Sequence, residues 1–212
     1  MLKFTDSQEN KLYITGCLHG FHKQPFIWEK RGYNSPEDHT AGLIKTINET
    51  CRETDTLFIL GDITLNCNFK QFWEFIWALK PQIYTVFGNH NHPMNDLFLQ
   101  DCKEMFGYEV IGYKWKDKIT SWGHYVEMKW NGQFCCFGHY PIAIFNKMHH
   151  NSWSLHSHNH GSYEPSLPSN TTIKQLDCGW DVFSKPICFQ EIQKIMNNKK
   201  FQPKDHHDKG VN

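Results

Sequence analysis

The sequence lacks an excess of basic residues, long apolar runs and cysteines in CxxC spacing. Lys plus Arg and Asp plus Glu number 22 each, so the 212-residue chain has no net charge and lacks the basic surface that long nucleic acids need. No apolar run is long enough to span a membrane, and the N-terminal stretch MLKFTDSQENK has no apolar signal core. The eight cysteines include no CxxC pair. We therefore expect a cytoplasmic protein with reduced thiols and no membrane contact.

Short apolar runs divide the first half of the chain into alternating elements. Strands are predicted at Leu12–Thr15, Thr56–Leu60 and 83–87, because runs this short and apolar are typical of a sheet covered by helices. A helix is predicted to start near Ser35, where Ser, Pro and Glu follow one another as in a helix N-terminus. Two further helices are predicted at 69–80 and 95–106. This alternation favours parallel strands.

The second half has a different pattern. A hairpin is predicted from 124–130 and 133–137, joined by an Asn-Gly turn. Two further strands are predicted at 152–155 and 173–176, so we expect this half to be largely antiparallel. A last helix is predicted from Cys188 to about residue 199. Neither a repeat nor a linker is visible, which predicts one domain over residues 1–200 and a loose polar tail over 201–212.

Side chains that bind metals recur at the ends of these separate apolar runs. They are His19 in GCLH, Asp62 in LGD, Asn89 in FGNHN, His139 in FGHYP, and His158 and His160 in LHSHNHG. Each fragment alone can be an ordinary turn or a solvated strand, and only their combination carries weight. Oxygen and imidazole donors, with one carboxylate able to bridge, suit a pair of divalent ions. The sequence thus predicts a site for two metal ions.

The ordered set of motifs resembles the calcineurin-like metallophosphoesterase superfamily, and most closely its small bacterial and phage members. The resemblance covers about residues 11–195 and implies an α/β fold, a four-layer α/β/β/α sandwich with two mixed sheets and the metals at one rim. The matching segments are TGCLHGFH (15–22), LGD (60–62), GNHN (88–91), GHYP (138–141), LHSHNH (155–160), DCGWD (177–181) and KPI (185–187).

The resemblance also implies a role for each residue. Asp62 would bridge two divalent ions, drawn from Mn, Fe, Zn or Ni, and His19 and His160 would complete the first metal site. The second site would use Asn89, His139 and His158. His90 would contact the phosphate and protonate the leaving oxygen. The implied reaction is hydrolysis of small phosphomonoesters or phosphodiesters by a metal-bridging hydroxide.

Three positions depart from the family pattern. Cys17 stands where the family has an aspartate that binds the first metal, and a thiolate ligand would shift the preference toward Zn²⁺ or Fe²⁺. The alternatives are a small buried residue that leaves the first site weak, or an oxidisable thiol. Asn91 replaces an acidic residue that would orient His90, so we predict a catalytic His90 that protonates less readily and a lower pH optimum. Ser157 replaces a glycine, with a mild effect expected.

Several other polar residues match the family without a settled role. His22 and Arg31 can face the substrate phosphate, or they can be a surface histidine and a loop salt bridge. His156 is expected to point away from the ligand pair that follows it. For Asp177 and Asp181 we expect a structural role.

Two rival functions stay open at this stage. Cys17 and Asn91 are compatible with an impaired relative that keeps the fold and one metal and serves as a binding protein. A nuclease of the same superfamily would need a basic groove or a capping domain, and neither is evident in the sequence. The oligomeric state and the natural substrate are not determined by the sequence.

Overall fold

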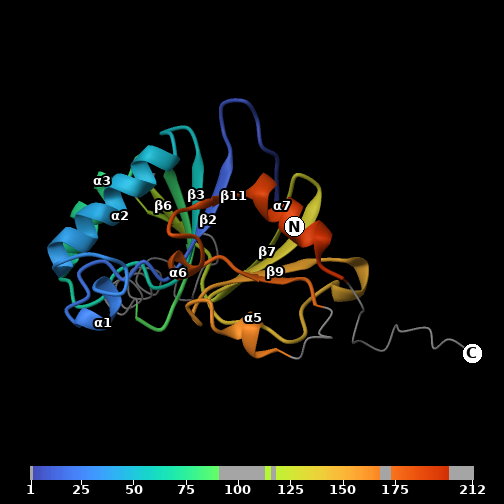
Figure 1. The fold of residues 1–212 in the computed structure, drawn as a ribbon. Helices are drawn as coiled ribbons and strands as arrows, with labels where there is room; N and C mark the ends of the chain where they lie inside the picture. The colour runs from blue at the N-terminus through green and yellow to red at the C-terminus, as the bar shows by residue number, and fades with distance from the viewer. Residues whose placement is uncertain (1, 91–112, 116–117, 168–172, 201–212) are drawn as a thin grey trace, which may run out of the picture.

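The computed structural model describes residues 2–90, 113–115, 118–167 and 173–200, which form two mixed β-sheets flanked by helices (Figure 1). This confirms the predicted sandwich. The first sheet has the strand order β11-β2-β3-β4-β6-β5, and the second has the order β1-β7-β8-β9-β10. The strands of the first sheet are β2 (Leu12–Thr15), β3 (Thr56–Leu60), β4 (Gln82–Val86), β5 (Tyr113–Trp115), β6 (Ile119–Ser121) and β11 (Ile187–Cys188). Those of the second are β1 (Leu2–Phe4), β7 (Tyr125–Trp130), β8 (Gln133–Gly138), β9 (Trp153–His156) and β10 (Gln175–Asp177).

The first half of the chain folds as its pattern predicts. Strands β2, β3 and β4 pair in parallel, and all five residues of β3 are buried. Helix α2 (Pro36–Thr50) begins after Ser35, whose Oγ accepts the backbone N–H of Asp38 at 3.0 Å. Helix α3 (Phe69–Ala78) ends before Pro81. The helix predicted at 95–106 lies outside the described residues.

Three apolar clusters hold these layers together. Helices α2 and α3 cover the outer face of the first sheet through residues that include Leu43, Ile47, Phe75 and Ile76. Between the sheets, Phe58 of β3 stacks on Phe137 of β8 with ring centroids 4.5 Å apart. Helix α7 (Phe189–Asn198) packs into this same inter-sheet cluster. A smaller cluster around the 3₁₀ helix η1 (Met148–His150) covers the outer face of β8.

The second half of the chain corrects the predicted strand directions. The hairpin of β7 and β8 is antiparallel as predicted, with Asn131 and Gly132 at φ 49° and 79° in its turn. The pairs β8–β9 and β9–β10 are parallel, whereas β5–β6 is antiparallel, so this half is mixed and not largely antiparallel as expected. The reason is that strand direction depends on where the long connection over 139–152 returns to the sheet. A local pattern of burial is the same in both directions.

Short helices complete the fold near one rim of the sandwich. They are α1 (Pro25–Trp28), α5 (Tyr163–Ser166) and α6 (Trp180–Phe183). The final helix begins at Phe189, directly after β11, and the tail over 201–212 lies outside the described residues. Among the described residues, every helix is too short or too polar to cross a lipid bilayer.

Candidate metal centre

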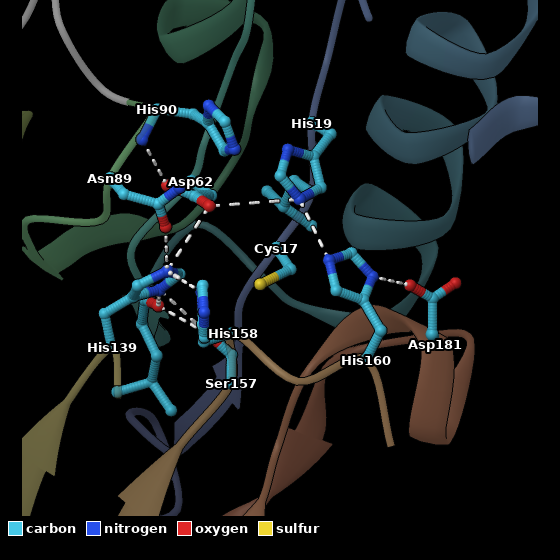
Figure 2. A network of polar contacts seen from close by, with 12 residues as sticks. Cys17, His19, Asp62, Asn89, His90, His139, Ser157, His158, His160 and Asp181 are labelled. Carbon is cyan, nitrogen blue, oxygen red and sulfur yellow. Dashed lines mark hydrogen bonds and ion pairs between the residues drawn. The ribbon is translucent and has the colours of Figure 1, made fainter. Parts of the chain in front are cut away.

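The predicted ligands come together at the rim where the carboxyl ends of several strands meet (Figure 2). Cys17 and His19 follow β2, Asp62 follows β3, and Asn89 follows β4. The second sheet adds His139 after β8 and His158 and His160 after β9. Because these strands run in parallel within each sheet, their C-terminal loops lie on the same side. Donor atoms that are far apart in the sequence therefore form one cluster.

The backbone of these loops is held in an unusual conformation. The loop after β2 stays paired with the loop after β3, since Cys17 N–H donates to Gly61 O at 3.2 Å and His19 N–H to Asp62 O at 3.0 Å. Five candidate ligands have positive φ, namely Cys17 (50°), His19 (54°), Asp62 (50°), His158 (38°) and His160 (51°). For non-glycine residues this region costs about 1–2 kcal/mol each. Such strain typically gathers at functional sites.

Asp62 lies between the two groups of histidines. Its Oδ1 accepts the backbone N–H of His90 at 2.9 Å, which fixes the carboxylate. Its Oδ2 lies 3.3 Å from His139 Nε2 and 3.9 Å from His19 Nε2. The side chain is almost fully buried. One carboxylate oxygen therefore faces imidazole nitrogens on two sides. The cluster divides here into two halves, one with His19 and His160 and the other with Asn89, His139 and His158.

Around His139, several nitrogen and oxygen atoms that can bind a metal converge. His139 Nδ1 lies 2.8 Å from the Leu60 carbonyl oxygen, so this nitrogen carries the proton. Its Nε2 is then a lone pair, yet it lies 2.8 Å from Asn89 Oδ1 and 3.0 Å from His158 Nδ1. The Asn89 oxygen and the lone pair of His139 Nε2 repel each other, and a cation between them removes the repulsion. This half of the cluster has the donor set of a divalent metal site.

The other half shows the same arrangement around His160. Its Nδ1 contacts Asp181 Oδ2, so the proton lies on Nδ1 and Nε2 is a free lone pair. That Nε2 faces His19 Nε2 at 3.3 Å, with the two rings almost parallel at 9°. His19 Nδ1 is buried and has no hydrogen-bond partner among the described residues. A cation bound by both Nε2 atoms would leave Nδ1 to carry the proton of His19.

Burial keeps these imidazoles in the form that binds metals. It lowers the pKa of His19 well below its ordinary value, and neighbouring positive charges, His160 first, lower it further. Burial also lowers the pKa of His139 and of His158, although Asp62 opposes this in both cases. A metal competes with protons for the same nitrogen, so neutral imidazoles near pH 7 favour metal binding.

Cys17 belongs to both halves of the cluster. Its thiol can join His19 and His160 around one ion, or Asp62 and His139 around another, with the ligand atoms of each group within 4.8 Å of one another. Burial raises the pKa of the Cys17 thiol far above its ordinary value, and the charge of Asp62 raises it further. A thiolate therefore needs a cation beside it, and metal binding here would release a proton. The same burial and pKa work against an oxidisable thiol.

The remaining predicted site residues lie around this cluster. The ring of His90 lies 5.7 Å from that of His19, and the ring of His22 lies 5.8 Å from it. His22 Nδ1 accepts the Gln24 N–H at 3.1 Å, which places the proton of the neutral ring on Nε2. Burial lowers the pKa of His22. Asn91 lies outside the described residues.

Arg31 forms the loop salt bridge that was one of its two predicted alternatives. It pairs with Asp181 at 2.9 Å, and its side chain is 4% exposed. His156 is fully buried, and its Nε2 lies 3.4 Å from Glu164 Oε1. Asp177 has the structural role expected of it, because its carboxylate accepts the N–H groups of Gly161 and Gly179.

Comparison with known proteins identifies the family. The calcineurin-like phosphoesterase model matches residues 11–206. The chain belongs to the calcineurin-like phosphoesterase family. An uncharacterized protein of Methanocaldococcus jannaschii is 24% identical over 195 residues, which is 90% of this chain and 93% of that protein. The crystal structure of a protein of unknown function from Aquifex aeolicus shares the fold with a TM-score of 0.62 and 19% identity, covering 88% of this chain and 99% of that one.

The contacts of two residues in this fold could not be predicted from the local sequence. Ser157, which replaces a family glycine, donates its Oγ–H to the Leu60 carbonyl at 2.6 Å and lies 3.3 Å from His139 Nδ1. The Ser157 hydroxyl and His139 Nδ1 thus donate to the same Leu60 carbonyl oxygen, which sets the tautomer of His139. Asp181 contacts His160, which lies 21 residues away in the sequence. Only the family motif pointed to Asp181, and the motif did not indicate its partner.

Proposed function

We propose that this protein is a metal-dependent phosphoesterase that hydrolyses small phosphomonoesters or phosphodiesters. The observation that carries the proposal is the position of Asp62, whose Oδ2 faces His139 on one side and His19 on the other. A carboxylate in that position can bridge two divalent ions. Membership of the calcineurin-like phosphoesterase family supports the reaction class.

The residues divide into two ion-binding groups around the shared Asp62. His19, His160 and Cys17 would hold one divalent ion, and Asn89, His139 and His158 would hold the other. Zn²⁺, Fe²⁺, Mn²⁺ and Ni²⁺ are all compatible with imidazole and carboxylate donors, and a Cys17 thiolate favours the softer ions. When bound, such ions neutralise the charge on a phosphate and lower the pKa of water.

The chain itself would orient the phosphate and handle protons. The proton of neutral His22 lies on Nε2, because its Nδ1 accepts the Gln24 N–H, so Nε2 can donate to a phosphate oxygen. His90 is fixed at its backbone by Asp62, and its imidazole can donate a proton to the leaving oxygen. We propose that Asn91, which stands where the family has an acidic residue, serves His90 as a neutral partner. The zero net charge of the chain favours a small substrate over long nucleic acid.

The proposal is tested by hydrolysis of an aryl phosphate and a bis-aryl phosphate. Protein stripped of metal is refilled separately with Mn²⁺, Fe²⁺, Zn²⁺ and Ni²⁺, and Asp62→Asn is the test variant. We expect metal-dependent turnover that falls at least about 100-fold in Asp62→Asn. His150→Ala, a change on the surface away from the cluster, is the control. Absence of turnover with every metal, or full activity of Asp62→Asn, would contradict the proposal.

A second candidate is an impaired relative that binds one ion and acts as a binding protein. The raised pKa of the buried Cys17 thiol favours it, because a protonated thiol is a poor ligand. The two candidates differ in metal content after reconstitution. About two ions per chain supports the enzyme, whereas one ion per chain without turnover supports the binding protein.

A further inference from the structure

The guanidinium of Arg31 has every N–H group engaged within the protein. Nε and Nη2 donate to the two carboxylate oxygens of Asp181, each at 2.9 Å. Nη2 also donates to Cys17 O at 2.8 Å, while Nη1 donates to Leu18 O at 2.7 Å and lies 3.0 Å from His39 Nε2. These contacts use all five N–H groups of a guanidinium. Arg31 therefore has none left for a substrate phosphate.

The partners of Arg31 are themselves in fixed states. Burial, with the charge of Arg31, lowers the pKa of His39 to about 4, so His39 is neutral and its Nε2 accepts a hydrogen bond. Burial alone would raise the pKa of Asp181, but hydrogen bonds from Arg31 and His160 outweigh it and hold this pKa well below its usual range. Asp181 is therefore a permanent carboxylate between a guanidinium and an imidazole.

Arg31 supports the whole group formed by Cys17, His19 and His160. Among the described residues, its guanidinium contacts none of Asn89, His139 and His158. Through Asp181 it fixes the ring and the tautomer of His160. Through the carbonyl oxygens of Cys17 and Leu18 it holds the loop that carries both Cys17 and His19. These contacts connect segments 150 residues apart in the sequence.

In the other half of the cluster, His139 is supported by neutral groups. His139 Nδ1 donates to the Leu60 carbonyl, which the Ser157 hydroxyl also contacts. A charged carboxylate behind an imidazole raises its basicity more than a carbonyl does, so the two halves are supported unequally. A change at Arg31 should therefore affect one half alone.

We propose that Arg31 is a positioning residue for the half of the cluster that contains Cys17, His19 and His160. It acts through Asp181 on the imidazole of His160 and through two carbonyl oxygens on the loop after β2. The affinity for one of two bound ions then depends on Arg31, and the affinity for the other does not. This inference rests on the proposed function in one respect, that the cluster binds divalent ions.

The test is a calorimetric titration of the metal-free protein with Zn²⁺, repeated with Co²⁺ to follow the visible absorption of each bound ion. The variant Arg31→Lys keeps the charge and loses the planar fork. We expect the affinity for one ion to fall about 10- to 100-fold and the affinity for the other to stay within about twofold. The Co²⁺ spectrum should lose the features of one ion only.

A matched control is Arg52, which forms a similar bidentate pair with an aspartate, Asp55. Arg52 donates Nη2 to Asp55 Oδ1 at 3.0 Å and Nε to Asp55 Oδ2 at 3.3 Å, and it contacts none of the candidate ligands. Arg52→Lys should leave both ion affinities unchanged. If Arg31→Lys impairs folding, Asp181→Asn gives the same test, because it keeps the shape of the side chain and removes its charge.

The outcomes separate this inference from the proposed function. Two ions bound with wild-type affinity by folded Arg31→Lys and Asp181→Asn would overturn the positioning role and leave the phosphoesterase proposal standing. Equal weakening of both ions would also overturn it, because Arg31 would then support the fold in general. A wild-type protein that binds no ion would overturn both proposals together.

Discussion

His19 and His160 face each other through their Nε2 atoms at 3.3 Å, with nearly parallel rings. The proton of His160 lies on Nδ1, against Asp181, so only His19 could supply a proton between the two nitrogens. A divalent ion satisfies both lone pairs at once. An ion bound between these two nitrogens would therefore stabilise the folded state.

Metal removal should lower thermal stability. An ion present at 100 times its Kd stabilises the folded state by about 2.7 kcal/mol, which for a chain of this size raises Tm by about 5–10 °C. Thermal melts with chelator and with Zn²⁺ or Mn²⁺ measure the difference. The rise in Tm on adding metal should be smaller in His19→Ala and unchanged in His150→Ala. An identical Tm with and without metal in the wild type would contradict the prediction.

Cys17→Asp should change the metal preference. A carboxylate is a harder ligand than a thiolate, so we expect the ratio of Zn²⁺ to Mn²⁺ affinity to fall by at least about tenfold. Competition titrations between the two ions measure this ratio. Cys188→Ser, at the start of α7 and away from the cluster, should leave it unchanged. An unaltered ratio in Cys17→Asp would mean that the thiol does not bind a metal.

Gly88→Ala should damage the site through Asp62. A Cβ at residue 88 would lie 2.0 Å from Asp62 Oδ1 and 2.5 Å from Asp62 N, so the carboxylate and its backbone must move. We expect metal affinity to fall at least about tenfold, as for other losses of ligand orientation. Gly138→Ala is the matched control, since its nearest neighbour would be 3.7 Å away. Equal metal binding by both variants would show that Asp62 tolerates the displacement.

Asp55 should make the fold sensitive to acid. Burial would raise its pKa, but hydrogen bonds from Arg52 and from backbone N–H groups outweigh burial and lower it. Because the folded pKa lies below the unfolded value of about 3.9, Asp55 stabilises the fold above about pH 4. That contribution is lost as the pH falls through the folded pKa.

Urea unfolding of Asp55→Ala measures this contribution. The backbone N–H groups of Lys11 and Arg52 lose their acceptor, so we expect a loss of about 2 kcal/mol at neutral pH that shrinks in acid. Glu74→Gln, which breaks an exposed pair with Lys70, should have almost no effect. A loss that is constant from neutral pH to about pH 2 would exclude the carboxylate as its source.

The sequence by itself determined the strands that carry the first ligands. The apolar runs of β2 and β3 are bounded as predicted, because burial on both faces of a central strand leaves a local pattern. The candidate ligands were also visible, since each comes shortly after the end of such a run. The helix cap at Ser35 and the Asn-Gly turn depend on neighbouring residues only, so both could also be predicted from the sequence.

Only the tertiary structure decided how these residues are supported. The direction of β9 and β10 depends on long connections, and the engagement of Arg31 with Asp181 joins residues 150 positions apart. Neither the strand directions nor the Arg31–Asp181 contact produces a recognisable local sequence pattern. Contacts of this kind arise when distant loops meet at one rim, so their geometry is set by the packing of the whole sandwich and not by any local pattern.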